Sequence, residues 1–310
     1  MLFLTDRCPV GCAHCSVDSR GDSPTITDFE LFEEIVEAIC TRPELELVGI
    51  SGGEPFVERR GLAYASEQVV EAGKDLVVYT SGVWATRPET QPWIRDVLRR
   101  CSCVFLSTDA FHEEKIQNAR FVRAAHAIAE EGVWIVVQVL DIPRMVDKAE
   151  VLLREAFGER HTEFAEVHLI PPLPYGRGAV VFMRTKHTPG RAFGPCGAVA
   201  APVIRYDGLV SACCNENVLM GGGPEQLRRR CGSKDELNGA IDDFYSDPLL
   251  RSIGGVGPGA LTAHPRFADL ADEEFTSICE LCWKLLRRTE SDEEPDRVIQ
   301  ALDLVGRAAP

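Results

Sequence analysis

The sequence predicts an α/β fold, in which the strands of a parallel sheet alternate with helices, and three observations support this prediction. Six short runs rich in Val, Ile and Leu recur at intervals of roughly 25–30 residues in the first part of the chain. The segments between these runs repeat apolar residues three and four positions apart, as amphipathic helices do. Gly, Ser and Asp residues directly follow several runs, where the carboxyl ends of parallel strands would lie. Six such units predict a partial (β/α)6 barrel.

The individual elements can be placed from turn and cap signals. The expected strands lie at residues 2–5, 45–50, 76–80, 103–108, 134–140 and 167–170. The expected helices lie at residues 28–40, 62–72, 92–100, 118–131 and 146–157. Thr27 or Asp28 can cap the first helix, and Pro92 is suited to open the third. Gly73 and Gly132 are suited to end the second and the fourth.

The strand–helix alternation ends near residue 172. A connection rich in Pro and Gly follows and contains the tetrapeptide Tyr175-Gly176-Arg177-Gly178. The remainder lacks clear periodicity, so we expect a metal site to organise it, with a last helix at 296–304. We therefore predict a barrel at 1–172, an irregular metal-binding extension at 173–290, and a C-terminal helix and tail at 291–310.

Composition and charge restrict the class of protein. The chain has 310 residues, 45% of them hydrophobic, which is enough for a core and argues against disorder. Its formal net charge of −15 disfavours nucleic acid and anionic membranes as partners and suits a cationic substrate. No apolar run is long enough to cross a bilayer. The first strand begins at Met1, so we expect no signal peptide, and twelve cysteines then predict metal ligands and buried thiols in a reducing cytoplasm.

Three of these cysteines lie within eight residues, in Cys8-Pro9-Val10-Gly11-Cys12-Ala13-His14-Cys15. Thiolates are the preferred ligands of iron–sulfur clusters. Three of them can hold three irons of a 4Fe–4S cluster and leave the fourth iron open to another ligand. An odd, closely spaced set disfavours disulfides. A zinc site with His14 as the fourth ligand is the alternative that the residues leave open.

A second motif, Ser51-Gly52-Gly53-Glu54-Pro55, follows the second expected strand. Together with the Cys-x3-Cys-x2-Cys spacing, it resembles the signature of the radical S-adenosylmethionine (SAM) superfamily. The resemblance implies that Cys8, Cys12 and Cys15 bind a 4Fe–4S cluster whose open iron binds SAM. It implies an enzyme that cleaves SAM to a 5′-deoxyadenosyl radical, which then removes a hydrogen atom from a substrate carbon.

The resemblance also implies a binding site for SAM. The segment Gly52, Gly53, Glu54 and Pro55 is expected to bind its amino group. Ser107 and Asp109, at the end of the fourth expected strand, are candidates for its ribose. Asp109 can equally cap the following helix.

A second cysteine group follows in the expected extension. Cys196 and Cys213 flank Gly208, and Cys279 and Cys282 come later. This spacing resembles the twitch form of the SPASM extensions of radical SAM enzymes. The resemblance implies a second 4Fe–4S cluster with these four ligands, with Cys214 as the alternative to Cys213. A structural zinc ion on the same thiols is the competing interpretation.

Three further residues are candidates for catalysis. Cys214 or Cys231 could donate a hydrogen atom to a substrate radical, and the cationic neighbours of Cys231 would favour its thiolate. His112 could bind substrate or accept a proton at the mouth of the barrel. The alternative for Cys231 is an ordinary free thiol, and for His112 a solvated helix start.

The predicted activity is that of a radical SAM oxidoreductase. The layout resembles radical SAM enzymes of aminoglycoside pathways, which implies dehydrogenation or epimerisation of a cationic aminosugar. The alternative is a maturase of ribosomally made peptides that forms a crosslink, a thioether or a D-residue. Against it, we expect no room before Cys8 for a domain that binds a leader peptide. Either activity would need an external one-electron reductant of the flavodoxin or ferredoxin type. The sequence does not specify the substrate or the carbon attacked.

Overall fold

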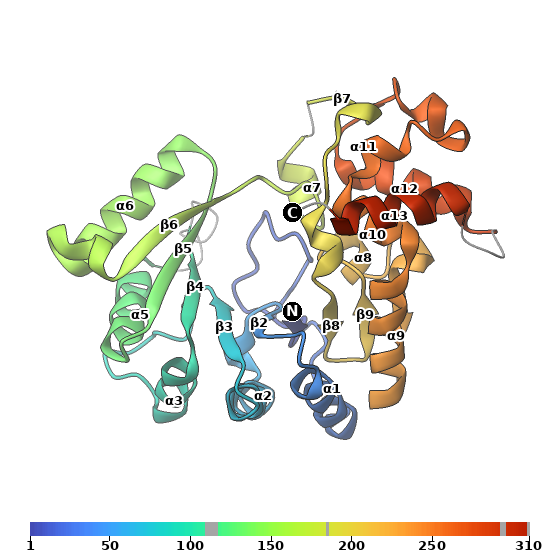
Figure 1. The fold of residues 1–310 in the computed structure, drawn as a ribbon. Helices are drawn as coiled ribbons and strands as arrows, with labels where there is room; N and C mark the ends of the chain where they lie inside the picture. Colours follow the sequence, from blue (N-terminus) through green and yellow to red (C-terminus); the bar gives the residue numbers. More distant parts are fainter. Residues whose placement is uncertain (109–116, 184–185, 292–295, 309–310) are drawn as a thin grey trace. The chain divides into compact units, whose positions relative to one another are not determined.

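The computed structural model describes residues 1–108, 117–183, 186–291 and 296–308. The chain divides into two compact units (Figure 1). The first contains Met1–Phe182 together with Arg205–Asp207, and the second contains Met183–Ile204 and Gly208–Pro310. The expected division into 1–172, 173–290 and 291–310 stays a prediction.

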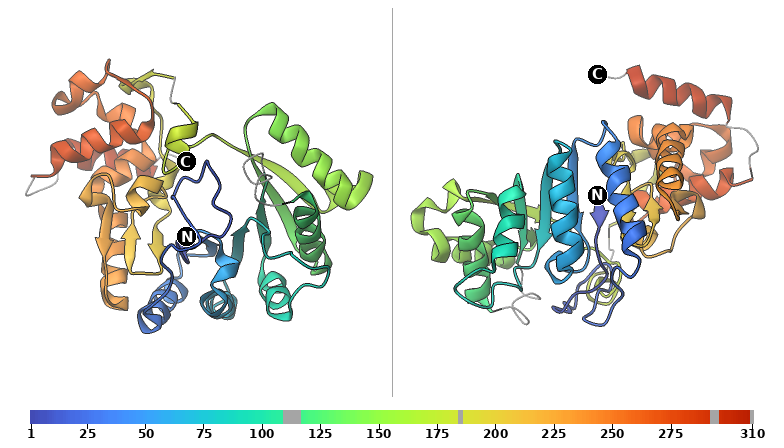
Figure 2. Two further views of the ribbon diagram at one scale, coloured as in Figure 1. Left: turned by 180° about the vertical axis from the view of Figure 1, so that it is seen from behind. Right: turned by 90° about the horizontal axis from the view of Figure 1, so that it is seen from below.

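The first unit is built on six parallel strands that pair in sequence order, from β1 to β6. The strands are β1 (Leu2–Phe3), β2 (Leu47–Ser51), β3 (Asp75–Thr80), β4 (Cys103–Ser107), β5 (Trp134–Leu140) and β6 (Ala165–Ile170). The main helices are α1 (Phe29–Thr41), α2 (Arg59–Glu71), α3 (Pro92–Arg100), α5 (Asn118–Glu130) and α6 (Pro143–Phe157). These helices lie outside the curved sheet (Figures 1 and 2). The predicted partial (β/α)6 barrel is confirmed.

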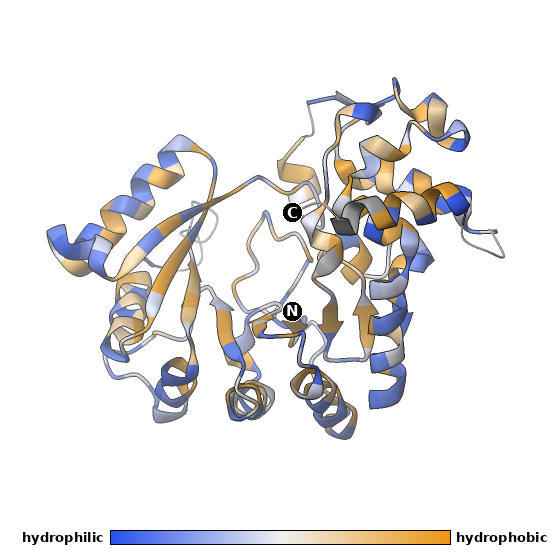
Figure 3. Ribbon diagram, viewed as in Figure 1, coloured by the Kyte–Doolittle hydropathy of each residue, from blue (hydrophilic) through white to orange (hydrophobic). Residues whose placement is uncertain are grey.

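The two faces of this sheet differ in what covers them. Leu76, Val104 and Leu106 point toward the helices and are completely buried. Burying one such side chain stabilises the fold by roughly 1.5–3 kcal/mol. Tyr79 and Gln138 alternate with buried neighbours, point to the opposite face and are only half-buried. Figure 3 shows the corresponding pattern, with largely hydrophobic strands and two-sided helices.

Most predicted boundaries agree with the structure to within a few residues, and the exceptions have local causes. Helix α6 begins at Pro143, because Ile142 precedes it in an extended conformation and Pro143 fits the first helical turn. Helix α2 begins at Arg59, directly after the short 3-10 helix Pro55–Val57. The expected first strand is shorter, since only Leu2 and Phe3 pair with β2.

The strands that follow residue 182 pair in antiparallel fashion. Strand β8 (Val203–Arg205) pairs with β9 (Leu209–Ser211), and β9 pairs with β10 (Arg228–Arg230). Strand β7 (Thr188–Pro189) pairs with β11 (Glu274–Phe275) in a separate two-stranded sheet. Strands β8 and β9 form a hairpin, and Gly208 has the positive φ of +81° that its turn requires.

The second unit has more helix than its sequence pattern predicts. The helices are α8 (Glu216–Leu219), α9 (Lys234–Ser246), α10 (Pro248–Gly255), α11 (Pro258–Leu261), α12 (Ile278–Thr289) and α13 (Arg297–Ala308). Two of them begin with capping boxes that the sequence analysis missed. Ser233 and Glu236 form the box of α9, and Ser277 and Glu280 form that of α12. The expected helix at 296–304 is confirmed as part of α13.

None of the helices among the described residues combines the length and the apolar character that crossing a lipid bilayer requires.

Candidate active site and metal centres

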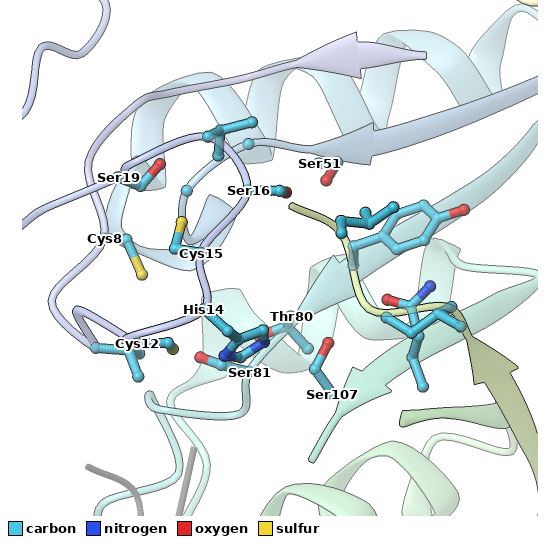
Figure 4. Close-up of a pocket in the computed structure, with 18 of the residues that line it drawn as sticks. Cys8, Cys12, His14, Cys15, Ser16, Ser19, Ser51, Thr80, Ser81 and Ser107 are labelled. Atoms are coloured by element: carbon cyan, nitrogen blue, oxygen red, sulfur yellow. The ribbon is translucent and has the colours of Figure 1, made fainter. Parts of the chain in front are cut away.

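The cysteine loop, residues 8–15, follows β1 and forms one wall of a cavity of about 200 Å³ in the first unit. Cys8 and Cys15 are half-buried, Cys12 is buried, and all three line the cavity (Figure 4). Gly11 has a φ of +63°, which lets the backbone turn between Cys8 and Cys12. The structure therefore brings the three predicted thiols of this loop to one cavity wall.

A distant segment fixes the backbone of the cysteine loop. The Arg177 Nε donates to the Cys12 carbonyl at 2.8 Å, and the Arg177 amide donates to the Cys15 carbonyl at 3.0 Å. The same guanidinium donates to Asp18 at 2.6 Å and lowers the pKa of that carboxyl. A Cβ on Gly176 would lie 2.6 Å from the Cys15 carbonyl oxygen, so only glycine allows this close approach. The sequence places this segment in a connection rich in Pro and Gly, and nothing in its local pattern predicts this role.

The predicted Gly52-Gly53 pair packs against the root of the cysteine loop. A Cβ on Gly52 would lie 2.6 Å from the Thr5 carbonyl oxygen, and one on Gly53 would lie 2.4 Å from that of Arg7. The Gly53 amide donates to the Thr5 carbonyl at 2.6 Å. Both glycines also line the cavity. The close approach that requires glycine here is therefore to the chain itself, and the pair holds the end of β2 beside the thiols.

Glu54 and Pro55 lie behind the cavity, and neither is among the described residues that line it. The Glu54 side chain is fully buried and accepts hydrogen bonds from the Thr80 hydroxyl at 2.8 Å and the Ser81 amide at 2.9 Å. Burial raises the pKa of Glu54, and its hydrogen bonds with Ser81 and Thr80 oppose that rise. Glu54 thus joins the ends of β2 and β3, which carry two walls of the cavity.

The wall opposite the thiols carries hydroxyl and amide groups from the strand ends. Ser81 follows β3, the predicted Ser107 ends β4, and Gln138 pairs with Ser107 in the sheet register. Gln138 was missed, although a lone polar residue in the otherwise apolar strand β5 is a detectable signal. The predicted residues Asp109 and His112 lie outside the described residues.

The donor set suits the predicted cluster. Burial raises the pKa of the Cys8 thiol to about 12, and the negative charges of Glu54 and Cys12 add to this rise. Without a metal this thiol therefore stays protonated at neutral pH, and binding iron would release its proton. Three cysteines and a cavity with polar walls fit a cluster that shares its site with a polar ligand.

The four predicted cysteines of the second group lie near one another within the second unit. Cys213 and Cys282 are buried, and Cys196 and Cys279 are half-buried. Burial raises the pKa of Cys282 well above its usual value, and the charges of the other three thiols raise it further. The Asn215 side-chain amide donates to the Cys279 sulfur at 3.3 Å.

Cys196 also lines a cavity of about 240 Å³ in the second unit, near the Arg251–Asp303 ion pair of 3.0 Å.

Neither cysteine group has the geometry of a mononuclear metal site in the described part of the chain. Among the described residues, no three His, Cys, Asp or Glu side chains are placed to hold one metal ion.

The two candidate hydrogen-atom donors differ in exposure. Cys214 is exposed and lies next to Cys213, whereas Cys231 is buried at 4% exposure after β10. The charges of Arg229 and Arg230 lower the pKa of Cys231, as expected of cationic neighbours, but burial and the Glu236 charge raise it, and the net shift is upward. The role of Cys231 as a hydrogen-atom donor stays a prediction.

Comparisons with known proteins agree with this description. Residues 2–155 match the family model of the radical SAM superfamily. A Bacillus subtilis (strain 168) protein, YydG, whose name provisionally assigns it to peptide biosynthesis, is 22% identical over 120 residues, 38% of each chain. The match thus spans well under half of that relative. A solved structure of native anSMEcpe with bound AdoMet and a Cp18Cys peptide has a TM-score of 0.55 at 13% identity, covering 98% of this chain and 94% of that one. At this identity the structural likeness indicates a shared fold.

Proposed function

This chain belongs to the radical SAM superfamily through residues 2–155, and from that premise we propose that it is a peptide-modifying radical SAM enzyme. The family implies SAM and one 4Fe–4S cluster as cofactors. The observation that carries the proposal is the shared cavity, in which three thiols face strand-end hydroxyl and amide groups. In this site Cys8, Cys12 and Cys15 would hold the cluster.

The chain's own residues have separate roles in this site. Gly52 and Gly53 keep the end of β2 against the cysteine loop, and Glu54 keeps β2 beside β3. Ser107 and Gln138 offer hydrogen bonds to the polar groups of SAM. When bound, the reduced cluster and SAM supply a carbon radical that can remove a hydrogen atom from an unactivated carbon. The protein binds, orients and shields these partners.

A peptide is the substrate class that the comparisons support best. The name of YydG refers to peptide biosynthesis, and the solved structure of similar fold contains a peptide. Modification would follow from the fate of the substrate radical, by crosslinking, thioether formation or return of a hydrogen atom to give a D-residue. In the last case the S–H of Cys214 or Cys231 would supply the hydrogen atom.

Dehydrogenation or epimerisation of an aminosugar is the second candidate. The observation that favours it is the net charge of −15, which would attract a polycationic substrate. An external one-electron reductant is needed in both cases. For either substrate, we further propose that Cys196, Cys213, Cys279 and Cys282 hold a second 4Fe–4S cluster.

The activity can be tested with anaerobically reconstituted protein, dithionite and SAM. We expect release of 5′-deoxyadenosine, and we expect none from the Cys12→Ala variant. A wild-type protein that contains iron and sulfide but releases no nucleoside would contradict the proposed function.

The substrate class can be tested by comparing nucleoside release with a short peptide encoded beside the gene and with a panel of aminosugars. Stimulation by the peptide, with a mass change in it, supports the first candidate, and stimulation by an aminosugar supports the second. Deuterium incorporated at a product carbon from deuterated water would indicate a thiol donor and epimerisation.

A further inference from the structure

Ser19 carries a buried hydroxyl group that the chain itself does not use. The residue is 1% exposed, and its Oγ has no hydrogen-bond partner among the described residues. Ser19 lines the same cavity as Cys8 and Cys15. Buried hydroxyl groups in folded proteins almost always have a partner, because an unsatisfied one is costly. The missing partner is therefore expected among the groups that the cavity binds.

The backbone on both sides of this hydroxyl is held firmly. The Ser19 carbonyl accepts hydrogen bonds from Nη1 and Nη2 of Arg177, each at 3.0 Å. The next residue, Arg20, accepts a hydrogen bond from the Cys8 amide at 2.8 Å. Because Arg177 also binds the Cys12 carbonyl, one guanidinium fixes Ser19 relative to the cysteine loop. The position of the hydroxyl in the cavity is thus defined by the same contacts that define the thiols.

The place of Ser19 in the cavity indicates which bound group it meets. Ser19 lies with Cys8 and Cys15 at one end, whereas Ser81 and Ser107 lie toward the other (Figure 4). The sulfurs of a cluster accept hydrogen bonds but cannot donate them, which matches an unused O–H donor.

We propose that the Ser19 hydroxyl donates a hydrogen bond to a sulfur of the cluster held by Cys8, Cys12 and Cys15, and that this bond raises the cluster's reduction potential. The inference rests on the proposed function, since it needs that cluster. Reduction adds negative charge to the cluster, so a donated hydrogen bond stabilises the reduced state more than the oxidised state. Ser19 would then make the first electron transfer easier.

The test is an EPR-monitored redox titration of the cluster in Ser19→Ala, in the background of Cys282→Ala so that the second group contributes no signal. We expect a more negative midpoint potential, with the reduction equilibrium lowered by up to roughly tenfold, or about 59 mV for a one-electron couple. Ser23→Ala is the matched control, because the Ser23 hydroxyl has a partner in the Arg20 amide at 2.9 Å and lies outside the cavity lining. The control should keep the starting potential.

Two further measurements separate the outcomes. In deuterated water, pulsed EPR should show an exchangeable deuteron coupled to the reduced cluster that is lost in Ser19→Ala and kept in Ser19→Thr. An unchanged potential in Ser19→Ala would overturn the inference, and so would a weaker affinity for SAM with an unchanged potential. Equal shifts in Ser19→Thr and Ser19→Ala would also overturn it, because packing would then be the cause.

The failure of the inference is distinguishable from failure of the proposed function. If the starting protein assembles no cluster, iron and sulfide analysis will show this before any titration. If Ser19→Ala alone fails to bind iron while Ser19→Thr and Ser23→Ala bind it fully, the hydroxyl is needed by the cluster, which supports the contact.

Discussion

The two cysteine groups of this chain differ in how their thiols are presented. In the first unit, three thiols line a cavity whose other walls carry hydroxyl and amide groups. In the second unit, four thiols lie near one another, and two of them, Cys213 and Cys282, expose less than a tenth of their surface. The first arrangement leaves room for a second ligand, whereas the second would supply four protein ligands to the proposed second cluster. Under that proposal, similar residues would prepare one cluster for chemistry and another for electron transfer.

The largest expected effect separates the two groups by function. Cys12→Ala should abolish release of 5′-deoxyadenosine, because the cluster that binds SAM loses one of its three ligands. Cys282→Ala should leave this release measurable, because the proposed second cluster would not take part in SAM cleavage. Nucleoside release under reducing conditions is the measurement, with the buried thiol variant Cys101→Ala as the control. Loss of cleavage in a Cys282→Ala variant that still holds about four irons would contradict this functional distinction.

The next effect concerns iron content. We expect about eight irons per chain in the reconstituted wild type and about four in Cys279→Ala or Cys282→Ala. The mutation removes one of the four predicted ligands of the proposed second cluster. Iron and sulfide analysis with Mössbauer spectroscopy checks this. Variants that keep roughly eight irons, or zinc in place of iron, would show that the second group has been assigned wrongly.

A smaller effect tests whether Arg177 stabilises the cysteine loop of the first unit. Arg177→Lys keeps the charge but loses the planar guanidinium, whose nitrogens donate hydrogen bonds to both the Cys12 and the Ser19 carbonyls. Losing one or more of these hydrogen bonds should destabilise the loop by about 1–2 kcal/mol. Release of iron to a chelator should then be roughly tenfold faster in the Cys282→Ala background.

Arg20→Lys is the control for this measurement. The Arg20 side chain is 61% exposed and contacts Asp18 at 3.2 Å, so its loss should change little. Equal rates for Arg177→Lys and Arg20→Lys would show that the loop does not depend on Arg177.

The sequence predicted the first unit better than the second for a physical reason. Strands such as Trp134–Leu140 are buried on their helix-facing side, and their apolar pattern is local and strong. The helices of the second unit also bury residues three and four positions apart, as Leu237 and Ile241 show in α9, but they do not alternate with strands, and several are only four to eight residues long. Their clearest boundary signals lie in caps such as Ser233 with Glu236. These signals are present in the sequence, and a search for capping boxes would have found them.

The candidate site likewise has one part that the sequence predicts and one part that it does not. Cys8, Cys12 and Cys15 share a short motif, so their proximity follows from the sequence itself. The contact between Arg177 and the Cys12 carbonyl joins residues 165 positions apart, and the close approach of Gly176 depends on the same fold. Tertiary contacts of this kind have no local signature, so they became visible only in the structure.

A further effect concerns the Glu54 carboxylate, which is buried behind the cavity of the first unit. Glu54→Gln replaces one acceptor oxygen by an NH2 group that faces donors on Thr80 or Ser81, which should cost about 1–3 kcal/mol of stability. Burial raises the folded-state pKa of Glu54 above its value in the unfolded chain. Below the raised pKa, the folded wild type therefore binds a proton at Glu54 that the unfolded chain does not yet bind. Its stability rises as pH falls through this range, down to the unfolded-state pKa near 4.5.

The glutamine variant cannot gain this stability, so the difference in urea midpoint between wild type and Glu54→Gln should widen as pH falls from 8 toward 5. The Glu58→Gln variant is a suitable control, because the Glu58 carboxylate contacts only the Thr25 hydroxyl among its described hydrogen bonds. A difference that narrows toward pH 5 would mean that the hydrogen bonds from Thr80 and Ser81 outweigh burial. The carboxylate would then join β2 to β3 as a stabilised anion behind the cavity of the first unit.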